Sequence, residues 1–319
     1  HPDFSKYNKN ISVDNWKVIL KGLYEELGIR IFVHNGRAFN KDSIKIIEYI
    51  RETLPESKIG IIDNGLTLYP YIDQLKHVYP DWIDISIDGM EIEHDTQRNK
   101  KGVFTKAVNA ILDIKKSKIS SKLSVLTCLT SINVESILEM ILFFNEKGIH
   151  NFFISPVSVL KNQRPSEALK VDKITFNRLI ERIFKKLSDL NNVFIEISIF
   201  DPDYLTLLSE ENKGRFNKFE WNYDHFLWKI TSEENEFSVS YYPLSLDGIR
   251  EFVVNCDGNI FLPKMMAKKN IGEHEKIGSL LTNKPGKLIH NFYKSESFNF
   301  YLDHFFEEKS YLCNIKEKL

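Results

Sequence analysis

The chain has 319 residues, of which 42% are hydrophobic, and its 43 lysines and arginines nearly balance 44 aspartates and glutamates. Such a chain has no net field to hold nucleic acid or an anionic membrane surface, so neither is expected as a partner. The longest apolar run, ILEMILFFN at 137–145, is shorter than the roughly 20 residues that span a bilayer. No signal peptide is visible in the start HPDFSKYNKN, and a cytoplasmic location is expected.

The three cysteines, Cys128, Cys256 and Cys313, are far apart and show no C-x2-C spacing. This pattern argues against a disulfide framework and against a complete zinc site. No metal ligand is therefore predicted in this chain, and each cysteine is expected to be a small buried or partly exposed thiol.

Short apolar runs rich in Ile, Val and Phe predict six strands, at 29–36, 58–65, 81–89, 122–130, 151–159 and 192–200. Segments with apolar residues three and four apart lie between them and predict amphipathic helices. Ser12, Asn133 and Asp172 stand where helix N-caps are expected, and Gly28 and Gly148 follow the last turns of two helices. Alternating strands and helices predict a parallel α/β domain over about residues 1–200, either an open doubly wound sheet or a barrel.

The carboxyl ends of parallel strands are where ligands bind in both architectures. Five neighbouring predicted strands end in small or polar residues, which predicts a polar ligand site there. These endings are His34-Asn35-Gly36-Arg37, Asp63-Asn64-Gly65, Ser86 with Asp88-Gly89, Thr130 with Asn133, and Ser155-Pro156.

The regular alternation stops near residue 200. Residues 201–250 mix aromatic and charged residues and are expected to form an irregular insertion, in which the aromatic stretch 216–228 either contacts a substrate or belongs to the core. Two alternating runs around Asp257-Gly258 predict a hairpin, and a helix is expected from Pro285. Residues 251–319 are therefore expected to be a small α+β extension.

The stretch DISIDGMEIEHDTQRNKKGVF, at 84–104, is predicted to be a strand followed by a long polar loop. Its Asp88, His94 and Asp95 suggest an acid/base pair, although a structural role for His94 and Asp95 is the stronger interpretation. Sequence motifs for phosphate loops, Rossmann dinucleotide sites, zinc proteases and α/β-hydrolases are absent, so those activities lose their main support.

The same stretch resembles a conserved segment of the radical S-adenosylmethionine (radical SAM) superfamily. SIDGMEIEHDTQRNKKGVFTKAVNAI is similar to the family's S-[IL]-D-G-x-x-x-x-H-D-x-x-R-x-x-x-G-x-F-x-x-A pattern at every fixed spacing. NGRAF at 35–39 stands where the family has G-G-E-P-[LF], and DNG at 63–65 where it has T-N-G. VVNCDGNIFLP followed by EKIGSLL resembles the family's C-terminal SPASM or twitch extension. The resemblance implies a partial (β/α)6 TIM-like barrel.

The resemblance also implies chemistry. In the family, a [4Fe-4S] cluster reduced by an external electron donor cleaves S-adenosylmethionine to a 5′-deoxyadenosyl radical, and the peptide-modifying branch acts on a peptide or protein substrate. The protein's part is to position cofactor and substrate. The implied cofactor-binding residues are Asn35, Gly36, Arg37, Asn64, Ser86, Asp88, Arg98 and Asn133. Asn35 to Arg37 would face the amino group and Arg98 the carboxylate. Asn133 would face the adenosyl part or cap its helix, and no catalytic residue is assigned.

The sequence departs from the family in three places. The cluster motif C-x3-C-x2-C is absent, and its ligands are expected upstream of His1. Asn35 and Arg37 replace a Gly and a Glu, which alters the implied amine site. Pro263-Lys264 stands where the extension has a cluster cysteine. These departures keep a second hypothesis open, a degenerate barrel that serves as a non-catalytic peptide-binding or regulatory partner, and a third, an unrelated α/β-barrel enzyme.

Overall fold

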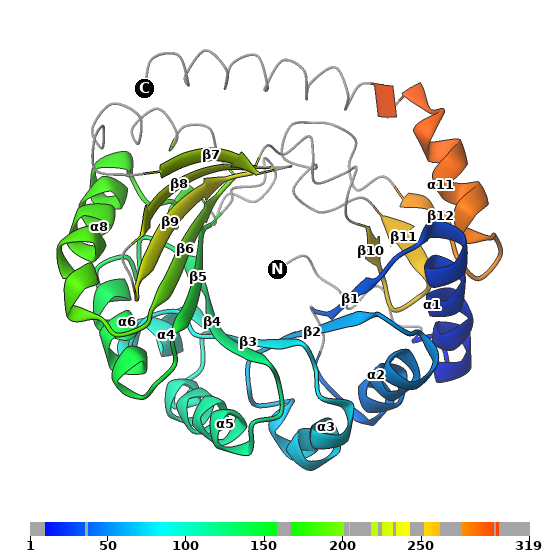
Figure 1. The fold of residues 1–319 in the computed structure, drawn as a ribbon, viewed down its shortest axis with the longest axis horizontal. Helices are drawn as coiled ribbons and strands as arrows, with labels where there is room; N and C mark the ends of the chain where they lie inside the picture. Colours follow the sequence, from blue (N-terminus) through cyan, green and yellow to red (C-terminus); the bar gives the residue numbers. More distant parts are fainter. Residues whose placement is uncertain are drawn as a thin grey trace. The chain divides into compact units, whose positions relative to one another are not determined.

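The computed structural model describes residues 10–35, 38–157, 167–200, 204, 218–222, 225–231, 234–242, 252–261, 276–296 and 298–299 (Figure 1). The chain divides into two compact units. The described residues of 1–32, 41–59 and 243–318 form the smaller unit, and those of 33–40 and 60–242 form the larger one. This division differs from the predicted domain boundaries, because the amino-terminal helices cluster with the carboxyl-terminal segment.

The smaller unit contains α1 (Val13–Leu27), α2 (Lys41–Thr53), α11 (Pro285–Tyr293), and the starts of β1 (Ile31–His34) and β2 (Lys58–Asp63). It also holds a three-stranded antiparallel sheet of β10 (Val253–Val254), β11 (Asn259–Phe261) and β12 (Lys276–Ser279). The tight turn between β10 and β11 places Gly258 at φ +77°, a conformation that glycine adopts without strain. The predicted hairpin and the helix at Pro285 are thus confirmed.

The larger unit is built on a curved sheet in the order β1-β2-β3-β4-β5-β6-β9-β8-β7, of which the carboxyl ends of β1 and β2 belong to it. Its other strands are β3 (Trp82–Ser86), β4 (Lys122–Leu129), β5 (Asn151–Pro156), β6 (Phe194–Ile199), β7 (Lys218–Asn222), β8 (His225–Thr231) and β9 (Glu236–Tyr241). From β2 to β6 and on to β9 the neighbours are parallel. The predicted α/β partial barrel is confirmed.

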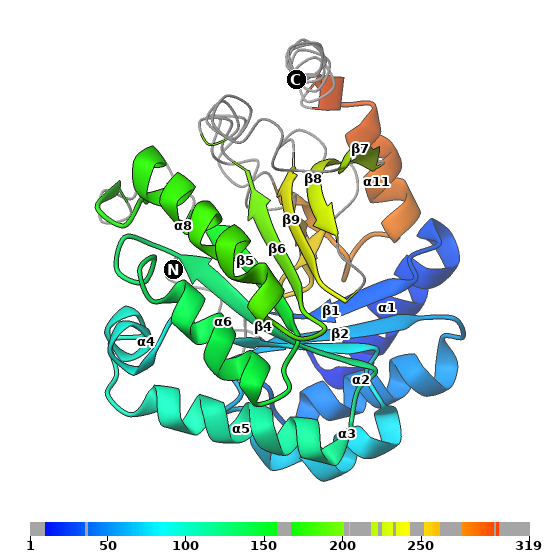
Figure 2. The same cartoon turned by 60° about the vertical axis from the view of Figure 1, so that its left-hand side comes forward.

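Helices α3 (Ile72–Val78), α5 (Val103–Ser117), α6 (Ile137–Glu146) and α8 (Lys173–Lys186) cover one face of this sheet (Figures 1 and 2). The strand residues that face them are buried aliphatics, such as Ile83, Val125 and Ile195, each fully inaccessible. Burial of these side chains against the helices is the main stabilising contribution to the barrel wall. Asp172 caps α8 as predicted, since its carboxylate accepts from the Thr175 N–H at 2.9 Å.

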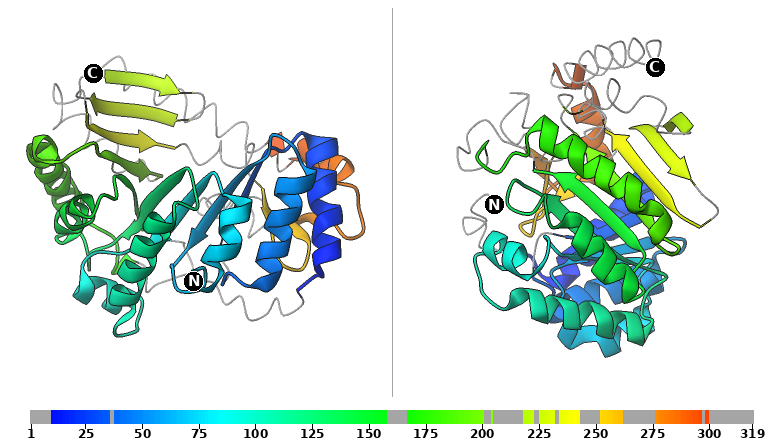
Figure 3. Two further views of the ribbon diagram at one scale, coloured as in Figure 1. Left: turned by 60° about the horizontal axis from the view of Figure 1, so that its bottom comes forward. Right: turned by 90° about the vertical axis from the view of Figure 1, so that its left-hand side faces the viewer.

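Two regions differ from their predicted structure. The expected polar loop after β3 contains a short helix, α4 (Glu91–Gln97). The described part of 201–250 forms β7, β8 and β9, where an irregular insertion was expected. β9 joins β6 in parallel, and β8 and β7 continue the sheet as antiparallel strands (Figure 3). The sequence does alternate there, as in FLWKI at 226–230, but each alternating run is short.

Candidate functional site

The end of β2 is organised by two side chains that bond to their own turn. Asp63 is buried, and its Oδ1 accepts from the backbone N–H groups of Gly65 (2.8 Å) and Leu68 (3.2 Å). The Thr67 hydroxyl donates to the other oxygen of Asp63 at 2.5 Å. The exposed Asn64 accepts from the Leu66 N–H at 2.9 Å. These bonds fix the turn and leave Asn64 exposed at the end of β2.

Asp88, two residues beyond the end of β3, is held at three points. Its side chain is 2% exposed; Arg98 Nη2 lies 2.6 Å from one carboxylate oxygen, and the Cys128 N–H donates to the other at 3.0 Å. Its own backbone N–H donates to Nδ1 of His94 at 2.9 Å. Because both carboxylate oxygens are used internally, Asp88 orients Arg98 and the start of the following turn.

His94 and Asp95 on α4 have structural roles, as the stronger interpretation held. The buried His94 ring accepts from the Asp88 N–H and packs edge-on against Phe104 with ring centroids 5.8 Å apart. Burial lowers the pKa of His94, which keeps the ring neutral and Nδ1 free to accept. Asp95 accepts from the N–H groups of Gly102 and Phe104 (2.9 Å) at the start of α5. An acid/base pair is not available here.

The end of β4 is tied to α4 by amide side chains. The carbonyl of Cys128 accepts from Gln97 Nε2 at 3.0 Å and from Asn133 Nδ2 at 2.8 Å. The Thr130 hydroxyl donates to Gln97 Oε1 at 2.8 Å, and the Thr130 N–H donates to Asn133 Oδ1 at 2.8 Å. Sequence reasoning missed Gln97, because its only signal is its place directly before Arg98.

Asn133 is not a helix cap. The helix that follows it, α6, has Ser136 at its N-cap position, and the fully buried Asn133 instead braces the end of β4. Gly89 lets the turn after β3 approach the segment that precedes α6 closely. Its φ is +100°, and a Cβ there would lie 2.8 Å from the Ser136 hydroxyl and 3.2 Å from the Cβ of Asn133. The turn therefore needs the charged side chain of Asp88 and, directly after it, a residue without a side chain.

Arg98 keeps hydrogen-bonding capacity after pairing with Asp88. Its Nε is buried and has no hydrogen-bond partner among the described residues, while the side chain as a whole is 32% exposed. A guanidinium presents five N–H donors in a fixed fork that matches a carboxylate. An unused buried donor is an observation of the kind expected beside an anionic ligand group.

The remaining predicted residues lie as follows. Ser86 is half-buried on β3, in register with Leu126 of β4 and on the same side of the strand as Asp84. Asn35 is exposed directly after β1. Gly36 and Arg37 lie outside the described residues. Ser86, Asp88, Arg98 and Asn133 are thus brought to the adjoining ends of β3 and β4.

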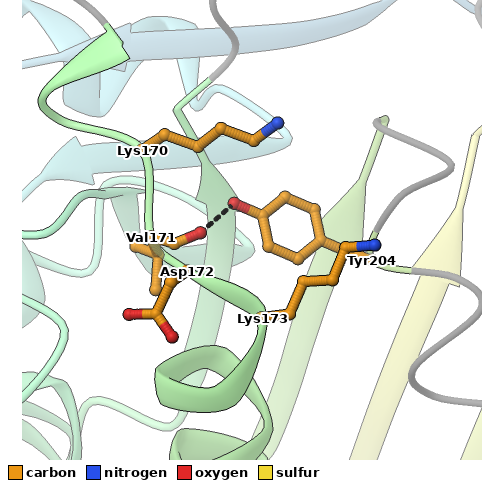
Figure 4. Close-up of a pocket in the computed structure, with 5 residues that line it drawn as sticks. All are labelled: Lys170, Val171, Asp172, Lys173 and Tyr204. Carbon is orange, nitrogen blue, oxygen red and sulfur yellow. Dashed lines mark hydrogen bonds between the residues drawn. The ribbon is translucent and has the colours of Figure 1, made fainter.

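A shallow pocket of about 330 Å³ lies at the start of α8, lined by Lys170, Val171, Asp172, Lys173 and Tyr204 (Figure 4). The Tyr204 hydroxyl donates to the Val171 carbonyl at 2.7 Å, and Asp172 is used as the cap of α8. These contacts are structural. Among the described residues, no cluster of three His, Cys, Asp or Glu side chains could hold a metal ion, and no helix is long and apolar enough to cross a membrane.

No family model matches the sequence, and no curated protein matches it by sequence. Solved structures do resemble the chain. SuiB from Streptococcus suis bound to its precursor peptide SuiA superposes with a TM-score of 0.60 at 13% identity, over 92% of this chain and 60% of SuiB. Native anSMEcpe with bound AdoMet and Kp18Cys peptide gives 0.60 at 15% identity, over 92% of this chain and 75% of that one.

The chain has the fold of these two proteins. SuiB bound to S-adenosylmethionine gives a TM-score of 0.59 at 14% identity, again over 60% of the SuiB chain. At such identities the comparison concerns the fold alone, and it confirms the fold that the resemblance to the radical SAM superfamily implied. This chain spans about three fifths of SuiB's length.

Proposed function

We propose that the chain is a radical SAM enzyme that binds S-adenosylmethionine where β2, β3 and β4 end and modifies a peptide or protein. The observation that carries the proposal is the Arg98 guanidinium, fixed by Asp88 at 2.6 Å and left with a buried Nε–H that no described residue accepts. Support comes from the family segment at 86–107, in which both residues fall, and from the fold shared with proteins that bind AdoMet and peptides.

The residues divide into those that would touch the cofactor and those that position them. Arg98 would pair with the methionine carboxylate through its planar fork. Ser86 and Asn64 have side chains at the strand ends with polar groups to offer. Asp88 and Asn133 spend their polar atoms on Arg98 and on the end of β4, so we assign them positioning roles. Asn35, Gly36 and Arg37 remain proposed for the amino group.

A [4Fe-4S] cluster, reduced by an external donor, would supply the electron that cleaves S-adenosylmethionine. The residues of this chain do not fit that group, because its three cysteines are far apart in sequence and the described residues hold no metal-ligand cluster. The same observation favours a second candidate function, a non-catalytic barrel that binds a peptide as a regulatory partner.

S-Adenosylmethionine binding can be followed through the Nε–H resonance of Arg98 in arginine-labelled protein. We expect a saturable shift of that resonance. Arg98→Lys keeps a charge beside Asp88 but loses the fork. Measured by titration calorimetry, it should weaken binding about tenfold or more, since a charge-assisted hydrogen bond contributes roughly 1.5–3 kcal/mol. Arg178→Lys, on the exposed side of α8, is the matched control and should change nothing. No shift at millimolar S-adenosylmethionine would overturn the site.

The two candidate functions are separated with protein expressed from its complete gene and reconstituted anaerobically with iron and sulfide. Formation of 5′-deoxyadenosine from S-adenosylmethionine in the presence of a reductant supports the enzyme. Saturable S-adenosylmethionine binding without any 5′-deoxyadenosine supports the non-catalytic partner and overturns the enzyme.

A further inference from the structure

The face of the large sheet opposite the helices carries its own polar chemistry on β6. Ile195, Ile197 and Ile199 are fully buried toward the helices, and the residues that alternate with them, including Glu196 and Ser198, face the other way. We call this side the inner face. It lies on the side of the sheet away from α6 and α8 (Figure 1).

Glu196 is held on the inner face by one of its two oxygens. The Tyr242 hydroxyl donates to Oε1 at 2.8 Å, and the Ser198 hydroxyl donates to the same oxygen at 3.1 Å. Within the described part of the chain, Oε2 accepts no hydrogen bond and Glu196 forms no ion pair. The carboxylate is therefore fixed in position and still has a full oxygen to offer.

The neighbouring charged groups do not neutralise Glu196. Lys229 of β8 is engaged with Glu236 of β9 at 2.7 Å. Lys122 of β4 lies over the rings of Phe153 and Phe194, 5.0 and 4.9 Å from their centroids. Among the described residues, neither lysine forms an ion pair with Glu196.

Aromatic rings flank this charge. Phe153 stands in register with Glu196 on the adjacent strand β5. On the other side, Phe200 stacks on Tyr242, the residue that holds Glu196, with ring centroids 5.5 Å apart. A carboxylate with aromatic side chains nearby attracts cations, because the ring faces carry negative partial charge.

We propose that Glu196 anchors a lysine or arginine side chain of the peptide substrate on the inner face, with Tyr242 and Ser198 as positioning residues. The carboxylate would pair with the ammonium or guanidinium group, and Phe153, Phe200 and Tyr242 would contact its aliphatic stem. The assignment of the cation to a peptide rests on the proposed function. The cation site itself stands on the geometry of β5, β6 and β9.

The test titrates labelled protein with three blocked pentapeptides, Ala-Ala-X-Ala-Ala, in which X is lysine, arginine or acetyl-lysine. We expect the lysine and arginine peptides to shift resonances of β5, β6 and β9 and to bind at least tenfold more tightly than the acetyl-lysine peptide. Glu196→Gln should remove this preference, and raising the salt concentration should weaken the charged peptides selectively.

Two further variants keep the test specific. Glu139→Gln makes the same charge change on an exposed position of α6 and should leave all three affinities unchanged. Tyr242→Phe should lose about threefold for the charged peptides while keeping their preference over acetyl-lysine, as expected of a positioning residue. Equal affinity for the lysine and acetyl-lysine peptides, or an unchanged preference in Glu196→Gln, would overturn the anchor.

The outcome is independent of S-adenosylmethionine. If the charged peptides bind as expected and Arg98 shows no shift with S-adenosylmethionine, the anchor stands and the proposed enzyme fails. If Arg98 binds S-adenosylmethionine and the peptides show no charge preference, the enzyme stands and the anchor fails.

Discussion

Carboxylates at the strand ends and carboxylates on the inner face of the same sheet are treated in opposite ways. Asp63 uses both oxygens within its own turn, and Asp88 uses one on Arg98 and the other on the Cys128 N–H of β4. Asp84 and Glu196 each keep one oxygen without a hydrogen bond from the described residues. An aspartate within a recognisable motif can therefore serve the local structure, while a glutamate in the middle of a strand keeps an oxygen that no described residue uses.

The largest effect is expected at Asp88, a buried carboxylate that uses both oxygens, when its ion-pair partner is removed. Arg98→Ala would leave the buried Asp88 without its counter-charge, and we expect a loss of about 3 kcal/mol in the free energy of unfolding, since breaking a buried pair by removing one partner is strongly destabilising. Urea denaturation measures it. Arg178→Ala, which breaks an exposed contact to Glu135 at 3.9 Å, is the control and should cost less than about 0.5 kcal/mol. Equal losses in Arg98→Ala and Arg178→Ala would show that Asp88 does not depend on Arg98 as its counter-charge.

Replacing Asp84 should raise the free energy of unfolding, whereas replacing Arg98 lowers it. Burial raises the pKa of Asp84 to about 6, so the folded state binds more protons than the unfolded state between about pH 4 and 6. Stability from this group is therefore lost as the pH rises through that window. Asp84→Asn should be more stable than the wild type above pH 6 by about 1–2 kcal/mol and gain nothing at pH 4.

Asp73→Asn, at an exposed residue paired with Lys76, controls for the Asp84 change and should stay within about 0.5 kcal/mol of the wild type. A less stable Asp84→Asn protein at pH 7 would mean that the Asp84 carboxylate is stabilised after all.

His94, next to Asp88, makes its own contribution to the pH dependence of the unfolding free energy. Because burial lowers the pKa of His94, the unfolded state binds more protons just below pH 6.5, and stability from this group is lost as the pH falls through its folded pKa. His94→Asn keeps an acceptor for the Asp88 N–H and cannot titrate. It should flatten the fall in unfolding free energy between pH 7 and 5. An identical slope in both proteins would contradict the assignment.

The smallest effect on stability is expected at Glu196. Glu196→Gln keeps an oxygen for the Tyr242 and Ser198 hydroxyls and breaks no ion pair, so its unfolding free energy should stay within about 0.5 kcal/mol of the wild type. Thermal unfolding in parallel with the peptide titrations checks this. A loss above about 2 kcal/mol would show that Glu196, like Asp88, is needed for the stability of the fold.

Local patterns predicted the strands but not the pairing of their side chains. The six strands, the hairpin at Asp257-Gly258 and the caps at Ser12 and Asp172 follow from periodicity and turn chemistry, and the structure confirms them. The contact of Asp88 with Arg98 depends on α4. That helix has almost no apolar period and is held by side-chain bonds to the backbone, so the sequence predicted a loop.

Glu196 was missed for a different reason. The run FIEISI at 194–199 shows which residues alternate, but the surroundings of Glu196 come from β9, in a segment expected to be irregular. Strand pairing over such a distance is set by the whole sheet and leaves little trace in a local window. The positions of Gly36 and Arg37 remain predictions.

The pairing of β9 with β6 also bears on how the protein reaches its folded state. Asp88 finds His94 six residues along the chain, whereas Tyr242 is 46 residues beyond Glu196. Closing a long loop costs more entropy than closing a short one, and contacts distant in sequence form slowly. The contact of Asp88 with His94 can therefore form within its own segment, whereas the contacts of Asp88 with the Cys128 N–H and of Glu196 with Tyr242 need β4 and β9 to have joined the sheet.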